Sequence, residues 1–91
     1  MSTFPNYAFK NINASGTIVV SKGPGVLHTI IMNNTNQNGA TLIYDGLNTS
    51  GTLIATLGSS IPAGANMIYD VRFNALTVQV VGNQDLTLSI G

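Results

Sequence analysis

Residues 23–33, GPGVLHTIIMN, form the longest uninterrupted strand pattern in the chain and hold its only histidine. The Gly-Pro-Gly start predicts a turn, because glycine allows positive φ and proline restricts φ. Alternation along the strand then divides the side chains between two faces. One face holds Val26, His28, Ile30 and Met32, and the other holds Leu27, Thr29, Ile31 and Asn33. Since both faces are partly apolar, we expect one to pack on the core and the other to be partly covered.

The rest of the chain repeats this pattern at intervals of roughly ten residues, with turn-forming residues between the runs. The expected strands are 7–12, 17–21, 26–33, 40–45, 52–57, 66–73, 76–81 and 86–90. No stretch has helical periodicity. The pattern predicts an all-β fold, a small antiparallel β-sandwich that is jelly-roll-like, with about eight short strands. Residues 1–12 are expected to be an N-terminal extended arm or first strand, and residues 13–91 a single β-sandwich domain.

Alternation within these strands separates expected core residues from expected surface residues. The inward set comprises Ile18, Val20, Leu42, Tyr44, Leu53, Ala55, Leu57, Met67, Tyr69, Val71, Phe73, Leu76, Val78, Val80, Leu86, Leu88 and Ile90. The outward set includes the β-branched residues Ile31, Ile43, Ile54, Ile68 and Val81. So many β-branched residues on outer faces favour a subunit interface. The alternatives are a second core layer, or an inverted assignment of some faces.

Two short segments resemble each other, LIYD at 42–45 and MIYD at 67–70. Two copies of so short a segment do not establish a repeat architecture. We interpret them as two strands in similar positions at the edge of the core.

The charge content of the chain is unusually low. Only 7% of the 91 residues are charged, three Lys or Arg and three Asp or Glu, while 44% are hydrophobic. A typical soluble domain carries about 25% charged residues. We therefore expect much of the surface to be covered by protein, through self-assembly or docking onto a large structure. The absence of cysteine excludes disulfides and thiolate metal sites.

Several classes of function are disfavoured by the same composition. The net charge is zero and no basic run exists. Nucleic-acid binding is therefore not expected, because it depends on basic side chains that neutralise phosphates. No apolar run approaches the ~18 residues of a membrane span. The first residues lack the basic and apolar regions of a secretory signal. We therefore expect the protein to be synthesised in a cytoplasm and not to associate with a membrane.

No group of residues points to catalysis. His28 shares its expected face with aliphatic residues, and a histidine there is typically structural. A catalytic role would require an orienting carboxylate and a nucleophile, yet no motif such as G-x-S-x-G is present. Asp45 and Asp85 lie at expected turns, where carboxylates commonly bind local backbone N–H groups. We expect no enzyme activity, no cofactor and no metal site.

The remaining charges and the N-terminal arm supply the last candidates for an interface. Asp70 alternates outward beside Arg72, either as a charge pair in or across the strand or as an intersubunit contact with Arg72 that fixes register. Phe4 and Tyr7 belong either to a loose terminus or to an arm that grips a neighbouring subunit. The candidate interface residues are Phe4, Tyr7, Ile31, Ile43, Ile54, Ile68, Asp70 and Arg72.

Three segments together resemble a group of small virion proteins of tailed bacteriophages. They read GPGVLHTIIMNN, TLIYDGLNTSGTLIATL and MIYDVRFNALTVQVVGNQDLTLSI, and the resemblance runs from about Ser15 to the last residue. It implies a jelly-roll-like sandwich that decorates or cements a capsid, often as a homotrimer, with no enzyme activity and no cofactor. The residues that match recurrent positions of the group are His28, Tyr44, Asp45, Tyr69 and Asp70.

The resemblance implies a virion structural protein, a capsid decoration or cement protein that stabilises a phage head by bridging capsomers. Its expected partners are further copies of itself and the major capsid protein, and its expected place is the capsid surface after synthesis in the host cytoplasm. Two alternatives stay open. One is a subunit of a tail, neck or baseplate appendage, and the other is a carbohydrate-binding module for host attachment. The inward assignment of Tyr44 and Tyr69 and the lack of tryptophan count against sugar binding.

Overall fold

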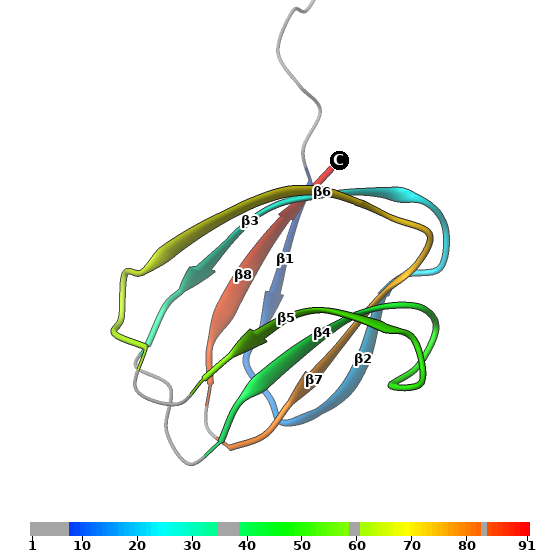
Figure 1. The fold of residues 1–91 in the computed structure, drawn as a ribbon. Helices are drawn as coiled ribbons and strands as arrows, with labels where there is room; N and C mark the ends of the chain where they lie inside the picture. The colour runs from blue at the N-terminus through cyan, green and yellow to red at the C-terminus, as the bar shows by residue number, and fades with distance from the viewer. Residues whose placement is uncertain (1–7, 35–38, 59–60, 83) are drawn as a thin grey trace, which may run out of the picture.

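The computed structural model describes residues 8–34, 39–58, 61–82 and 84–91. In these residues it forms two antiparallel four-stranded sheets that face each other, and no helix (Figure 1). The strands are β1 (Ala8–Ile12), β2 (Gly16–Ser21), β3 (Gly25–Met32), β4 (Thr41–Asp45), β5 (Thr52–Leu57), β6 (Asn66–Phe73), β7 (Leu76–Val80) and β8 (Leu86–Ile90). The predicted all-β sandwich with eight short strands is confirmed. Phe4 and Tyr7 lie outside the described residues.

The strand order follows from one long ribbon folded back on itself. β4 pairs with β5, β3 with β6, β2 with β7 and β1 with β8, so the first half of the chain runs against the second half. The ribbon then rolls up, which brings β3 against β8 and β4 against β7. The resulting orders, β1-β8-β3-β6 and β2-β7-β4-β5, are those of a jelly roll.

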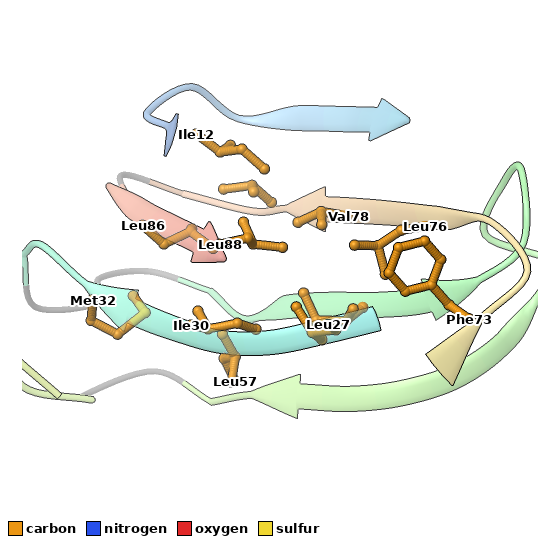
Figure 2. Packing of buried hydrophobic residues seen from close by; sticks show 12 residues of the cluster. Ile12, Leu27, Ile30, Met32, Leu57, Phe73, Leu76, Val78, Leu86 and Leu88 are labelled. Atoms are coloured by element: carbon orange, nitrogen blue, oxygen red, sulfur yellow. The ribbon is translucent and has the colours of Figure 1, made fainter. Parts of the chain in front are cut away.

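The core is a single layer of aliphatic side chains between the sheets (Figure 2). Inward residues line up in rows across each sheet, because paired residues of neighbouring strands share a face. One row of the first sheet joins Leu88, Ile30 and Met67, and one row of the second joins Val78 and Ile43. The fully buried large side chains include Leu27, Ile30, Met32, Ile43, Leu76, Leu86, Leu88 and Val78. This layer fixes which face of every strand is inward.

β-Bulges change the phase of the alternation in the first half of the chain. β3 carries an extra residue, His28, against β8, and the register against β6 shifts at the same point. Leu27 and Ile30 are consequently both fully buried, which regular alternation does not allow. The prediction that Val26, His28, Ile30 and Met32 share a face is therefore wrong: the face changes at His28.

The faces predicted for β4 are also wrong. Ile43 is fully buried and pairs with the core residue Val78, whereas Leu42 and Tyr44 lie on the outer face. In β5 an extra residue, Ile54, bulges opposite β4, so both Ile54 and its neighbour pack against the core. Leu53 is half exposed instead of inward. Wherever β6, β7 and β8 were predicted to bury a side chain, that side chain is buried or partly buried.

Two glycines of the turn before β3 provide a matched test of this packing. A Cβ on Gly25 would lie 2.7 Å from the carbonyl oxygen of Gly91 and 2.8 Å from the Phe73 ring, whereas a Cβ on Gly23 would meet open space. We expect Gly25→Ala to lower the free energy of unfolding by about 1–3 kcal/mol, since neighbours must shift. Gly23→Ala should be neutral or slightly stabilising. Urea unfolding measures both, and equal effects would contradict the close approach at Gly25.

Candidate interaction surface

The outer face of the β1-β8-β3-β6 sheet carries the most exposed large apolar side chains of the described residues. Pairing aligns Phe9 with Ser89, Ser89 with Thr29 and Thr29 with Ile68, so one row crosses all four strands. Phe9 is 79% exposed and Ile68 is 67% exposed. They stand on the two edge strands, about 14 Å apart by three strand spacings, with small hydroxyl side chains between them.

Ile31 lies in the next row of the same face. It pairs with Asn66 of β6 and Thr87 of β8, and it is 39% exposed. The outward residues of the sheet are Phe9, Asn11, Val26, Thr29, Ile31, Asn66, Ile68, Arg72, Thr87 and Ser89, with His28 and Asp70 at the bulge. We call this surface the Phe9–Ile68 face. It combines a few large apolar groups with short polar ones.

The structure divides the predicted interface residues. Ile31, Ile68, Asp70 and Arg72 lie together on the Phe9–Ile68 face. Ile43 does not, because it is a fully buried core residue, and Ile54 packs against the core at the β5 bulge. Their outward assignment is corrected.

Phe9 was missing from the sequence-based candidates. A signal was available, since alternation from the buried Ile12 places Phe9 on the outer face of β1.

The outer face of the β2-β7-β4-β5 sheet is different in character. Val19 and Leu53 are exposed on its edge strands, and Tyr44 is partly buried between them. The inward assignment of Tyr44 is therefore wrong. Tyr69 does pack against the core, and its burial raises the pKa of the phenol.

Asp70 and His28 form a polar pair on the Phe9–Ile68 face. The His28 ring donates a hydrogen bond from Nδ1 to Oδ1 of Asp70, across the bulge that separates β3 from β6. Asp70 has φ of +49°, a left-handed conformation that Asp and Asn tolerate better than most residues. The predicted pair within the strand, Asp70 with Arg72, is not formed, because Asp70 turns to His28.

A second polar group ties β1, β3 and β8 together at the opposite end of the face. Asn11 and Asn33 each donate from Nδ2 to Oδ1 of Asp85, at 2.7 and 3.0 Å. The same amides donate to the hydroxyl of Thr87 at 3.3 and 2.9 Å. The Asn11 and Asn33 bonds stabilise the ionised form and hold the pKa of Asp85 below its usual range.

The edges of both sheets carry features that oppose strand-to-strand association. The edge strands are β1 and β6 in one sheet and β2 and β5 in the other. β2, β5 and β6 each contain a register shift, and in β1 Lys10 pairs with the buried Leu88, so a charge takes an inward position. Bulges and inward charges are known protections of exposed edges. The sheet faces are thus better suited than the edges to contact a partner.

Within the described residues, no group of three or more His, Cys, Asp or Glu side chains could hold a metal ion. The same residues include no helix with the length and apolarity needed to cross a membrane. In comparisons with known proteins, no family model matches the chain and no curated protein matches it.

The conformation of Asp70 leads to a test by substitution. Asp70→Asn keeps a side chain that tolerates positive φ and can still accept a hydrogen bond, so we expect it to change the free energy of unfolding by less than about 0.5 kcal/mol. Asp70→Ala loses both properties and should cost about 1–2 kcal/mol. Urea unfolding of the two variants distinguishes the backbone requirement from a need for the charge. Equal stability of both variants would contradict the role of the left-handed conformation.

The hydrogen bonds to Asp85 predict a dependence on pH. A carboxyl whose pKa is lowered by folding contributes stability above its unfolded pKa of about 3.9, and this contribution is lost as the pH falls through the folded value. Wild-type protein should therefore lose more stability than Asp85→Asn between about pH 5 and about pH 2. Urea unfolding across this range measures the difference. A parallel loss in both proteins, or an NMR titration of Asp85 at its ordinary pKa, would refute the prediction.

Proposed function

We propose that this chain is a virion structural protein that decorates and cements a bacteriophage capsid. The observation that carries the proposal is the Phe9–Ile68 face, where exposed apolar side chains stand on the outer face of a sheet in a chain of very low charge. Large exposed apolar side chains on one face of a small domain, set among polar ones, favour a protein-binding site. The resemblance to small phage virion proteins supplies the kind of partner, the major capsid protein.

The proposed mechanism is additional contact area across a shell. Each square ångström of apolar surface removed from water contributes roughly 25 cal/mol before the costs of ordering. One sheet face of a small domain gives a modest interface for each copy, but the binding free energies add over many copies on one capsid. Residues that bridge neighbouring capsomers then oppose their separation. A homotrimer, proposed from the same resemblance, would multiply the contacts of each decorating unit.

Protected edges support a face-mediated mode of assembly. A capsid presents many identical sites, so a decorating protein with open strand edges would risk pairing with its own copies. The bulges of β2, β5 and β6 and the inward register of Lys10 reduce this risk. A subunit of a tail, neck or baseplate appendage would use the same face. The location of the protein in the virion would distinguish this alternative from capsid decoration.

One observation favours the carbohydrate-binding alternative. Tyr44 lies outward on the β2-β7-β4-β5 sheet, one row from the polar side chain of Gln79. An aromatic ring beside hydrogen-bonding groups is typical of sugar sites, and a glycan array with Tyr44→Ala as control tests it. Specific binding that this variant loses would place host attachment ahead of capsid cementing.

Substitution on the two outer faces tests the capsid proposal. Ile68→Asp removes an exposed apolar contact on the Phe9–Ile68 face, and we expect roughly ten- to a hundredfold weaker binding to heads of the encoding phage. Leu53→Asp is the matched control, since Leu53 is 50% exposed on the other sheet. Cosedimentation with heads that lack the protein measures both affinities.

Two outcomes would contradict the proposal. If wild-type protein does not bind heads at all, capsid decoration is wrong. If Leu53→Asp weakens binding and Ile68→Asp does not, the docking face is the other sheet. Circular dichroism checks that each variant is folded, and light scattering checks that its self-association is unchanged.

A further inference from the structure

All three carboxylates of the chain have partners within the fold. Oδ1 of Asp45 accepts hydrogen bonds from the backbone N–H groups of Asn74 and Ala75, at 2.8 and 3.2 Å. Asp70 accepts from His28, and Asp85 accepts from two asparagine amides. Each aspartate side chain therefore already accepts at least one hydrogen bond from within the domain.

The positive charges are in the opposite situation. Within the described part of the chain, Lys10, Lys22 and Arg72 form no ion pair with any carboxylate. Arg72 is exposed on the Phe9–Ile68 face, beside Val26 of the neighbouring strand. The surface of the domain therefore offers cations to a partner, whereas its carboxylates already have donors.

Arg72 also borders an open cavity of about 410 Å³. The cavity is lined by Pro24, Gly25, Val26, Asp45, Arg72, Phe73 and Asn74. These residues come from the β2–β3 turn and the start of β3, the end of β4, and the end of β6 with the turn that follows it, which meet at the right-hand end of the sandwich in Figure 1. Lys22 precedes Pro24 in the first of these turns.

We propose that this cavity receives a carboxylate side chain of a protein partner, with the guanidinium of Arg72 as its binding group. A planar guanidinium matches a carboxylate with two parallel N–H donors. Pro24 and Val26 supply an apolar wall beside it. Under the capsid proposal, on which the identity of the partner rests, that carboxylate belongs to the shell protein.

The local charge favours a carboxylate over a more highly charged anion. Arg72 and Asp45 are the charged side chains that line the cavity, and Lys22 lies in the neighbouring turn. Because the Asp45 carboxylate also lines the cavity, a singly charged carboxylate meets less repulsion there than a phosphate dianion would. Asp45 stays bound to the β6–β7 turn through its two backbone donors and leaves Arg72 available.

NMR titration of the ¹⁵N-labelled full chain tests the site. The probe is an acetylated glycyl-glutamyl-glycine amide, and its glutaminyl counterpart is the uncharged control. Shifts should concentrate at the Arg72 Nε–H and at the amides of Gly25, Val26 and Asn74, and the dissociation constant should rise about three- to tenfold in Arg72→Gln. Lys10→Gln is the matched charge control and should bind as wild type does.

Three results would overturn the inference. They are equal shifts with the glutaminyl peptide, unchanged binding in Arg72→Gln, or tighter binding of inorganic phosphate at the same amides. Cosedimentation with phage heads separates this inference from the capsid proposal. Heads that bind Arg72→Gln as tightly as wild type, but not Ile68→Asp, would refute the Arg72 contact and leave the capsid proposal standing.

Discussion

Burial of one aliphatic layer between two sheets is the interaction on which the rest of this structure depends. The layer has no charged member, and with no cysteine in the chain it is not supported by disulfides. Each strand must therefore direct its apolar side chains inward wherever its register allows. Where pairing and burial conflict, as at His28 in β3 and Ile54 in β5, the strand bulges and the core stays filled. The irregularities of the outer faces are consequences of the packing inside.

This dependence explains how far the sequence could predict the fold. In β6, β7 and β8 alternation alone identified the inward side chains, because the inward positions stay in phase there. In β3 and β5 one inserted residue reversed the phase, and no composition signal marks such an insertion. LIYD and MIYD show the limit: Ile43 is buried in β4, whereas Ile68 is exposed in β6. The two isoleucines of these similar segments face opposite sides of their sheets, because the pairing with partner strands determines which side meets the core.

The Phe9–Ile68 face was predictable to a similar extent. Ile31, Ile68, Asp70 and Arg72 were placed outward correctly, since the inward positions of β6 stay in phase across its bulge and those of β3 stay in phase after His28. The partner of Asp70 was not predictable, because His28 approaches it only through the coincidence of shifts in β3 and β6. The cavity beside Arg72 likewise depends on the ends of β3, β4 and β6, which are far apart in sequence and meet only in the folded chain.

The nested ribbon has a consequence for the order of folding. Among the four ribbon pairs, β4 with β5 closes the shortest loop, and the other pairs close longer loops, up to β1 with β8. Since loop closure becomes costlier with length, pairing is expected to proceed outward from the central hairpin and to be slow overall. Phe9 joins its row only with the last pair, so the complete apolar face exists only on a finished domain. A chain in which β1 has not yet paired with β8 therefore lacks Phe9 at the edge of this face.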